Sequence, residues 1–361
     1  MPSIDTPRWV LCIDGGGTAC KAVAASTAGV VVRGIAGACN VKTVGHQAAI
    51  AAILAATSSA LAQADLPPPP PGFFSRVWLG LAGVLHQADI DAFAPYAQEA
   101  FGFAPGDSAL RISNDGHLLA SPCLRLEGVD SAVAIVAGTG SVGLAFRKSD
   151  GQAELVGRSG GWGYLLGDEG SGYAVARLAI TRLLADDDAR VSASLAHPAA
   201  LSLPCPTIFS ALLSHLDVPD AAALIDVTYS GEALRNAASF TLAETHRKVW
   251  VAEAARVVFS FAYEQPDVDA ASQGIALSIL AEAVAPLVGT VERLVGKRTT
   301  VVPERAVLSL GGGMWKAEGY RRLLLDGLRE KGIVFGGGVR VAESAAEEGA
   351  LALKAQLDAG L

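Results

Sequence analysis

Short apolar runs that end at clusters of glycine recur along this chain. The first run, Trp9–Ile13, leads into three glycines, and "KAVAAS" and "GVVVRG" follow closely. This order predicts a meander of three strands over residues 9–35. Large apolar residues at helical spacing predict a helix over 47–64. Further strands that end in turns are expected at 75–84, 109–116 and 305–315, and a closing helix at 343–357.

The strand–glycine–strand pattern begins again at residue 131, where "SAVAIVAGTGSVGLAFR" repeats the layout of the first meander. Strands that alternate with helices favour an α/β fold. Two halves that open alike predict a duplicated architecture with a cleft between two lobes. Between 172 and 297 the chain is alanine-rich with few strand signals, which predicts a helical section, and 186–206 has the composition of an irregular insert.

Composition narrows the class of protein. The chain has 361 residues, 51% hydrophobic and 18% charged, with a net charge of −8. Its length favours two domains, and its acidity disfavours nucleic-acid binding. The five cysteines form no CxxC pair, which argues against a disulfide framework or a zinc site and favours a reducing, cytoplasmic compartment. No signal peptide and no uncharged membrane-spanning run is recognised.

The first glycine cluster, "CIDGGGTACK", has the character of a phosphate site. Asp14 ends a strand directly before Gly15, Gly16, Gly17 and Thr18. Glycines allow backbone N–H groups to reach a phosphate, and the threonine hydroxyl adds a donor. A carboxylate beside such a loop suits hydrated Mg²⁺, and Lys21 can meet phosphate charge. A plain hairpin turn is the alternative that the local pattern leaves open.

Two further glycine clusters follow strands. In "AIVAGTGS", Gly138 and Thr139 combine free N–H groups with a hydroxyl, so two hairpins could clamp phosphates between them. In "SLGGGMW", glycines around Gly312 and Gly313 could let a flat adenine ring lie against the backbone. A tight turn before a helix explains this third cluster equally well.

Asp115, in "RISNDGHLLAS", comes just after a strand, where ligands bind in α/β sheets. A carboxylate there can orient and deprotonate an attacking hydroxyl. The alternative is an Asn-Asp-Gly turn in which Asp115 only forms the turn. We expect the neighbouring His117 to be structural.

The stretch "GGWGYLLGDEGSGY", residues 160–173, is rich in glycine but has no basic residue. Asp168 and Glu169 are adjacent, so their side chains diverge and are expected to differ in role. One would bind a ligand hydroxyl and the other would cap the following helix. The rings of Trp162 and Tyr164 are expected to pack in the core, because the segment is too apolar for a solvated loop.

Together these motifs resemble the N-acetylglucosamine kinase family, which belongs with the BadF/BadG-type ATPases in the superfamily of sugar kinases, heat-shock ATPases and actin. "IDGGGT", "NDG", "AGTGS", "GGWGYLLGDEGSGY" and "LSLGGG" occur in the expected order over residues 13–313. The resemblance implies two ribonuclease-H-like lobes with ATP and sugar in the cleft. Residues 1–130 would form the N-terminal lobe, joined by the terminal helix 345–361, and 131–344 would form the C-terminal lobe, with its helical section at 172–297.

The resemblance also implies roles for individual residues. Asp14, Gly15, Gly16, Gly17 and Thr18 would face the ATP phosphates and Mg²⁺, and Gly312 and Gly313 would flank the nucleoside. Gly138 and Thr139 would lie where phosphate meets sugar. Asn40, Asp115 and Asp168 would bind sugar hydroxyls, with Asp115 as the base, and Gly163, Tyr164 and their neighbours up to Asp168 would line the sugar pocket.

The expected activity is transfer of phosphate from ATP to the 6-hydroxyl of N-acetylglucosamine. Relatives carry an aromatic residue shortly after the asparagine that Asn40 matches, whereas this chain has Val41 and Lys42, so the identity of the sugar stays open. Glucosamine, N-acetylmannosamine or a muramic sugar are alternative acceptors. An activator ATPase with an iron–sulfur cluster and a non-catalytic sugar sensor are the alternative functions. A homodimer is compatible with the resemblance.

Overall fold

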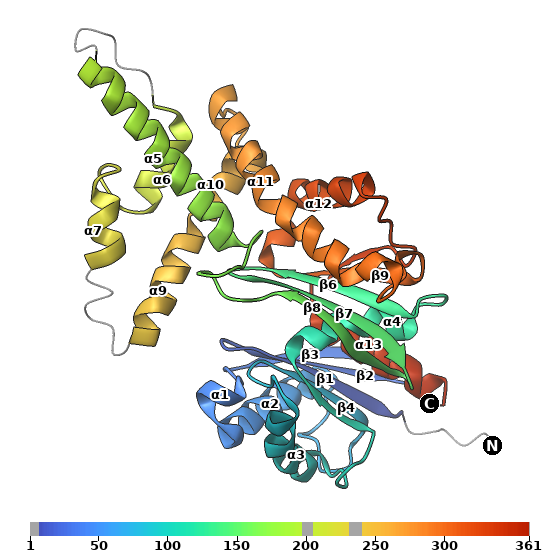
Figure 1. The fold of residues 1–361 in the computed structure, drawn as a ribbon. Helices are drawn as coiled ribbons and strands as arrows, with labels where there is room; N and C mark the ends of the chain where they lie inside the picture. Colours follow the sequence, from blue (N-terminus) through green and yellow to red (C-terminus); the bar gives the residue numbers. More distant parts are fainter. Residues whose placement is uncertain (1–6, 197–204, 231–239, 361) are drawn as a thin grey trace, which may run out of the picture.

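The computed structural model describes residues 7–196, 205–230 and 240–360. It contains two five-stranded sheets (Figure 1), with strand orders β3-β2-β1-β4-β5 and β10-β9-β6-β7-β8. The strands of the first sheet are β1 (Trp9–Gly15), β2 (Cys20–Ser26), β3 (Val31–Ala36), β4 (Phe74–Leu81) and β5 (Leu110–Ser113). Those of the second are β6 (Ser131–Ala137), β7 (Ser141–Ser149), β8 (Gln152–Gly160), β9 (Ala306–Gly311) and β10 (Val339–Val341).

The two sheets have the same topology. In the first sheet β1, β2 and β3 pair antiparallel, and β4 and β5 are added in parallel beyond β1. In the second, β6, β7 and β8 pair antiparallel, and β9 and β10 are added in parallel beyond β6. The prediction of an α/β fold with two similar lobes is therefore confirmed.

The central strands are apolar on both faces because both faces are covered. In β1, Leu11 and Ile13 point to the outer core of the first lobe, whereas Val10 and Cys12 point toward the second lobe. This two-sided burial explains why the strands appear in the sequence as continuous apolar runs rather than as alternating patterns.

The outer face of the first sheet is covered by helices α1 (Val41–Val44), α2 (His46–Ala62) and α3 (Gln87–Phe101). Between the two sheets lie the 3₁₀ helix η1 (Asp115–Ala120), α4 (Ser121–Arg125) and α13 (Ala345–Asp358) (Figure 1). Two ion pairs hold α13 in place. Arg33 of β3 pairs with Glu347 at 2.5 Å, and Arg125 of α4 pairs with Glu348 at 2.5 Å.

The helices between β8 and β9 form the helical section, which covers the outer face of the second sheet and extends to one side of it (Figure 1). They are α5 (Gly172–Ala196), α6 (Thr207–His215), α7 (Ala223–Ser230), α9 (Phe240–Glu253), α10 (Ala255–Phe259), the π-helical turn η2 (Ser260–Glu264) and α11 (Ala270–Val295). The 3₁₀ turns η3 (Gly296–Arg298) and η4 (Pro303–Arg305) lead into β9, and η5 (Gly313–Lys316) and α12 (Glu318–Glu330) follow it. The expected irregular insert is wrong for residues 186–196, which continue α5, and 197–204 lie outside the described residues.

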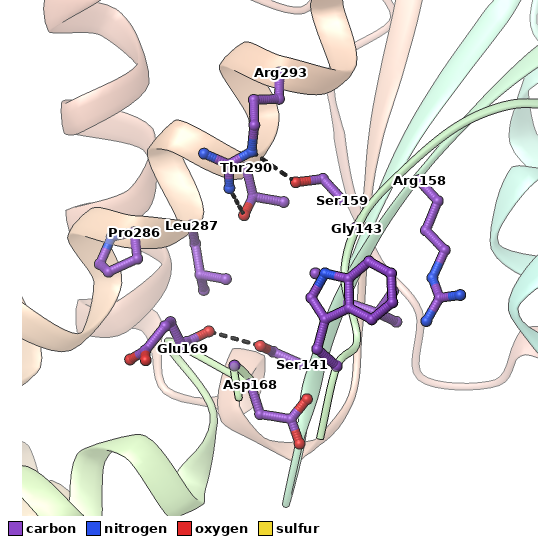
Figure 2. A pocket seen from close by; sticks show the side chains of 14 residues that line it. Ser141, Gly143, Arg158, Ser159, Asp168, Glu169, Pro286, Leu287, Thr290 and Arg293 are labelled. Atoms are coloured by element: carbon purple, nitrogen blue, oxygen red, sulfur yellow. Dashed lines mark hydrogen bonds between the residues drawn. The ribbon is translucent and has the colours of Figure 1, made fainter. Parts of the chain in front are cut away.

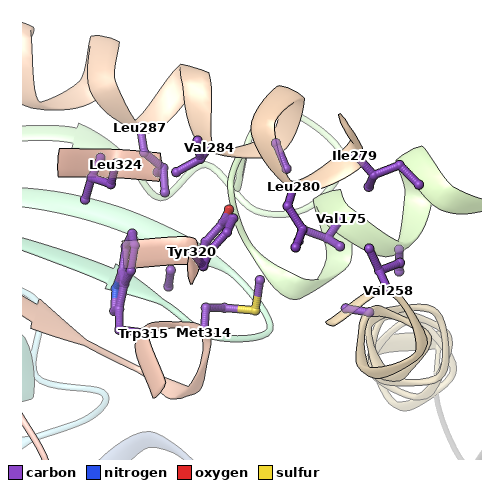
Figure 3. Packing of buried hydrophobic residues seen from close by; sticks show 14 of the residues in the cluster. Val175, Val258, Ile279, Leu280, Val284, Leu287, Met314, Trp315, Tyr320 and Leu324 are labelled. Carbon is purple, nitrogen blue, oxygen red and sulfur yellow. The ribbon is translucent and has the colours of Figure 1, made fainter. Parts of the chain in front are cut away.

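In the described chain, one helical stretch, Ala270–Arg298, which contains α11, is long and apolar enough to cross a membrane. Half of its apolar window is buried inside the protein. Figure 3 shows Val284 and Leu287 of α11 beside Tyr320 and Leu324 of α12, with Trp315 beneath them. The apolar character of α11 is therefore accounted for by the core of the second lobe.

Candidate active site

A cavity of about 1100 Å³ lies between the two lobes, and we call it the interlobe cavity. Both sheets contribute to its wall, at the ends of strands where the chain turns. Its lining comprises Asp14, Lys21, Asn114, Asp115, Gly116, Leu119, Val136, Val142, Leu144, Gly311, Gly312, Gly313, Lys316, Arg321, Val341, Ala342, Glu343 and Ala345. The structure thus brings together Asp14 and Lys21, which flank the first glycine cluster, with the third cluster and Asp115, whereas Gly15, Gly16, Gly17 and Thr18 are not among the lining residues.

The first glycine hairpin is tightly built at its base and open at its tip. A Cβ atom on Gly15 would lie 2.6 Å from the Leu81 side chain and 2.7 Å from Cys39 Sγ, so only glycine fits there. Gly16 N–H donates to the Ala19 carbonyl at 2.9 Å, whereas Gly17 and Thr18 are exposed. The tip can therefore meet a ligand without rearrangement of the sheet.

Asp14 and Asp115 face the same cavity. Burial raises the pKa of Asp14, and the nearby Lys21 ammonium, 4.0 Å from Asp14 Oδ2, partly opposes this shift. Burial also raises the pKa of Asp115, and the negative charge of Asp14 adds to the effect. Asp115 begins η1, and the Gly116 N–H donates to its Oδ1 at 2.9 Å. A carboxylate with a raised pKa is a better proton acceptor than an ordinary aspartate.

His117, two residues after Asp115, does not titrate near neutrality. Burial, and secondarily the positive charge of Arg111, lower its pKa to about 4. Its ring packs edge-on against Phe146, with centroids 5.1 Å apart. The residue packs between the lobes and is neutral at physiological pH, in agreement with the structural role expected for it.

The second hairpin lies at the start of the helical section. Gly138 N–H donates to the Gly140 carbonyl at 2.9 Å, and the Gly138 carbonyl accepts from Gly172 N–H, at the start of α5, at 2.7 Å. Thr139 is exposed, and neither Gly138 nor Thr139 lines the interlobe cavity. The third cluster does line it: Gly312 has φ of +100°, and a Cβ atom there would lie 2.3 Å from the Ala137 carbonyl oxygen.

Asp168 is buried, with a side chain only 5% exposed, and its backbone is left-handed at φ of +60°. Its Oδ2 accepts a hydrogen bond from Lys248 Nζ at 3.1 Å. The same oxygen lies 2.5 Å from the position that a Cβ atom would take on Gly140, so this carboxylate packs directly on the second hairpin. The sequence offered no signal for Lys248, which belongs to α9.

A second cavity, of about 430 Å³, has Asp168 in its lining, and we call it the acceptor-side pocket (Figure 2). Its wall combines β7, the end of β8, the loop before α5, and α11. The lining residues are Ser141, Val142, Gly143, Arg158, Ser159, Gly160, Trp162, Gly167, Asp168, Glu169, Pro286, Leu287, Thr290 and Arg293. Val142 also lines the interlobe cavity, so the two cavities adjoin.

Three expectations for this region are corrected by the structure. Trp162 is 67% exposed rather than packed in the core, and the loop exposes Leu165 and Leu166 as well. Tyr164 is half-buried against Tyr173, with ring centroids 4.8 Å apart. Neither acid caps α5: the Ser171 hydroxyl accepts from Ala174 N–H, while Glu169 lies 3.7 Å from Arg177.

Asn40 and Gly163 lie outside the linings of both cavities. Asn40 is the N-cap of α1, where its Oδ1 accepts from Lys42 N–H at 3.0 Å. Gly163 adopts φ of +81°, and its carbonyl accepts from Gly167 N–H at 2.8 Å, which closes the loop that precedes Asp168. Lys42, two residues after Asn40, pairs with Asp89 at 3.3 Å.

Two cations that sequence reasoning missed, Lys316 and Arg321, line the interlobe cavity near Gly312 and Gly313. Lys316 ends η5, which directly follows the third glycine cluster, so its proximity to that cluster was the only available signal. With Lys21 on the opposite lobe, these side chains give the cavity positive charge from both lobes. Such an arrangement suits a ligand with several phosphate groups.

The donors available for a metal ion fit Mg²⁺ rather than a transition metal. Among the described residues no group of three His, Cys, Asp or Glu side chains converges on one point. Asp14 and Asp115 nevertheless lie close enough for one charge to raise the pKa of the other. Mg²⁺ binds through one or two carboxylates together with water and substrate phosphates, and two carboxylates in an open cavity meet that requirement.

Comparisons with known proteins agree with this architecture. The described fold resembles a putative N-acetylglucosamine kinase from Porphyromonas gingivalis, with a TM-score of 0.59, 18% identity, and coverage of 98% of this chain and 100% of that one. It also resembles a putative N-acetylglucosamine kinase from Chromobacterium violaceum, with a TM-score of 0.57, 21% identity, and coverage of 96% and 99%. These similarities show the two-lobed, actin-like ATPase fold.

Sequence similarity adds the family. The model of the BadF/BadG/BcrA/BcrD ATPase family matches residues 11–353, so this chain belongs to that family. A curated relative, the N-acetyl-D-glucosamine kinase of Dictyostelium discoideum, is 35% identical over 99 residues. That match covers 27% of this chain and 28% of the relative.

Proposed function

We propose that this protein is an ATP-dependent amino-sugar kinase that phosphorylates the 6-hydroxyl of N-acetylglucosamine. The observation that carries the proposal is the placement of Asp14, near the end of β1, and Asp115, just after β5, in one cavity with Gly312 and Gly313. A nucleotide and a hydroxyl acceptor need such a cavity between two lobes. The names of the structurally similar proteins and of the curated relative support the same chemistry.

The nucleotide would lie between the first and third glycine clusters. Gly15, Gly16, Gly17 and Thr18 would face its phosphates, as would Lys21, and Gly312 and Gly313 would flank the nucleoside. The donors would be the Gly17 N–H and the Thr18 hydroxyl at the exposed tip, because the Gly16 N–H already donates to the Ala19 carbonyl. Asp14 would hold Mg²⁺ through water or directly, and the ion would neutralise charge on the phosphates. Lys316 and Arg321 add positive charge on the same side of the cavity.

The acceptor would lie between Asp115 and Asp168. Asp115 would take the proton of the attacking hydroxyl while that oxygen forms its bond to the terminal phosphorus and ADP leaves. Asp168, Gly163, Tyr164 and Asn40 would bind the sugar, with Gly138 and Thr139 at the junction with phosphate. Because Asn40 and Thr139 line neither cavity, their contacts would require the lobes to close over the sugar.

A coupled ADP-release assay with Mg-ATP and a panel of amino sugars tests this proposal. Among amino sugars without an acidic substituent, N-acetylglucosamine should give the highest kcat/KM, with N-acetylglucosamine 6-phosphate as product by mass spectrometry. Asp115→Asn should retain ATP and sugar binding and lose turnover by about a hundredfold or more. Asp91→Asn, on the exposed face of α3, is the matched control. Near-normal turnover of Asp115→Asn would rule out Asp115 as the general base.

Two other functions are distinguished by direct measurements. An activator ATPase would need cysteines at a shared surface, whereas Cys123 is fully buried and Cys205 is half-buried, so we expect purified protein without iron. A sugar sensor would bind sugar without turnover, and the paired carboxylates of the interlobe cavity argue against that function. If the protein prefers glucosamine, N-acetylmannosamine or a muramic sugar, the acceptor in this proposal changes and the kinase activity stands.

The same reasoning applies to the partners, the cellular location and the assembly of the protein. A net charge of −8 favours a small-molecule substrate over nucleic acid, and the residues of α11 that pack in the core of the second lobe favour a structural role for this helix over a membrane-spanning one. We propose a cytoplasmic enzyme that acts as a homodimer. Sedimentation of the purified protein tests its assembly.

A further inference from the structure

The acceptor-side pocket has two chemically different ends. Figure 2 shows Arg293, Thr290 and Ser159 at one end, Asp168 and Glu169 at the other, and Leu287 and Pro286 on one side. Its volume of about 430 Å³ lies within the range of small-molecule sites. The exposed indole of Trp162 contributes to the lining, which gives the pocket an aromatic surface of the kind that sugars use.

The Arg293 guanidinium is held by two hydroxyl groups. Its Nε donates to Ser159 Oγ at 2.9 Å, and its Nη2 donates to Thr290 Oγ1 at 3.0 Å. The side chains belong to β8 and α11, so the arrangement is fixed from two elements. Ser159 and Thr290 are buried, at 9% and 7% exposure, whereas Arg293 reaches solvent.

These three side chains offer a ligand more hydrogen-bond donors than acceptors. Each hydroxyl uses an oxygen lone pair on Arg293 and still has its own proton to donate. Within the described residues, neither hydroxyl donates to another protein group, and no carboxylate lies within 4.0 Å of Arg293. The guanidinium also has N–H donors beyond the two that bind the hydroxyls. This end of the pocket is therefore rich in donors, and a carboxylate would supply acceptors for them.

The other end carries acceptors whose charge is already balanced. Asp168 pairs with Lys248 at 3.1 Å, and Glu169 pairs with Arg177 at 3.7 Å. Neither acid is paired with Arg293. A ligand that spans the pocket would thus present hydroxyl groups to Asp168 and negatively charged oxygens to Arg293.

We propose that the acceptor-side pocket recognises an amino sugar with a carboxylate substituent, and that Arg293, Ser159 and Thr290 bind this carboxylate. The inference rests on the proposed function and extends its substrate class from N-acetylglucosamine to an N-acetylglucosamine that carries a carboxylate substituent. The planar fork of arginine matches a carboxylate in a two-point contact that an ammonium group cannot reproduce.

A matched pair of ligands tests this carboxylate subsite. N-acetylmuramic acid carries a carboxylate on an ether substituent of N-acetylglucosamine, and its methyl ester has nearly the same shape without the charge. Calorimetry in the absence of ATP should show that the acid binds about tenfold or more tightly than the ester. The ratio of kcat/KM for the two ligands should show the same preference, and added salt should reduce it.

Variants test which side chains cause the preference for the acid over the ester. Arg293→Met should bring the acid-to-ester ratio close to one, Arg293→Lys should give an intermediate ratio, and Thr290→Val should lower the ratio while it keeps the side-chain shape. Arg322→Met, on the exposed face of α12, is the matched control and should keep the wild-type ratio. Circular dichroism and thermal melting check that each variant is folded.

Two results would overturn the inference: equal affinity of acid and ester in the wild-type protein, or an unchanged preference in Arg293→Met. Failure of the proposed function would look different. If the acid is preferred in calorimetry but no amino sugar is phosphorylated, the carboxylate subsite stands and the kinase assignment falls.

Discussion

Lys248 Nζ lies 3.1 Å from Asp168 Oδ2 and thereby joins α9 of the helical section to the loop that closes the second hairpin. The pair is uneven in burial, because the lysine side chain is 26% exposed and the aspartate side chain 5%. The lysine also lies 5.8 Å from the centre of the Tyr164 ring. One half-buried cation therefore balances a buried carboxylate that the proposed acceptor would contact.

Removal of Lys248 should destabilise the protein and weaken acceptor binding. Lys248→Met leaves the Asp168 carboxylate without its counter-charge, so we expect a loss of about 1–3 kcal/mol in the free energy of unfolding. The KM for the sugar should rise more than the KM for ATP. Urea unfolding and steady-state kinetics measure the two effects.

A double-mutant cycle separates pairing from packing. Asp168→Asn tolerates the left-handed backbone and removes the charge, so the double variant should be less damaged than the sum of the single variants. A coupling energy near zero would show that Lys248 supports the loop by packing alone.

Asp115→Asn should stabilise the protein at neutral pH. Because the folded pKa of Asp115 lies above the unfolded value of 3.8, its contribution to stability is complete below that value and is lost as pH rises through the folded pKa. At pH 7 the ionised carboxylate lowers the stability of the folded state, and the neutral amide removes this effect. We expect a gain of about 1 kcal/mol at pH 7 that shrinks toward pH 4, measured by urea unfolding. A loss of stability at pH 7 would contradict this sign.

His117 should make the folded state sensitive to mild acid. Its folded pKa of about 4 lies below the unfolded value of 6.5, so its contribution to stability is present above 6.5 and is lost as pH falls toward 4. Between pH 6.5 and 5 this residue should cost about 2 kcal/mol of stability. His117→Phe should flatten the pH dependence of urea unfolding in that window. An unchanged slope would count against the neutral, buried histidine.

Neighbouring glycines of the third cluster should respond differently to alanine. Gly312→Ala places a methyl group 2.3 Å from the Ala137 carbonyl oxygen in a backbone of φ +100°, and should destabilise the protein by about 2 kcal/mol or more. At Gly313 a Cβ atom meets nothing within 4 Å, so Gly313→Ala should cost less than about 1 kcal/mol. Thermal melting of both variants checks the contrast, and equal losses would contradict it.

The strand framework and its glycine junctions could be predicted from the sequence because their signals are local. The apolar runs before Asp14, Gly138 and Gly312 become β1, β6 and β9, which are the central strands of the two sheets. Burial on both faces makes such strands apolar throughout, and the glycines mark where the backbone must turn closely. The repeated order of these signals also identified two similar lobes.

Partners from distant elements could not be predicted in this way. Lys248 and Asp168 are 80 positions apart, and α9 carries no motif that points to the loop. The exposure of Trp162 could not be predicted either. A large apolar residue is usually assigned to the core, although such side chains also line ligand sites. Asn40 was recognised by its motif, but its capping of α1 depends on a backbone geometry that the motif does not specify.

The position of α13 between the two sheets bears on how the chain assembles during synthesis. The sheet that contains β1, β2 and β3 is translated first, yet its inner face is covered by α13. Arg33 can pair with Glu347 only after the chain has grown by 314 further residues. Until those residues leave the ribosome, α13 cannot cover the apolar inner face of this sheet. Chaperones that hold nascent chains should therefore matter more for this protein than its modest size would imply.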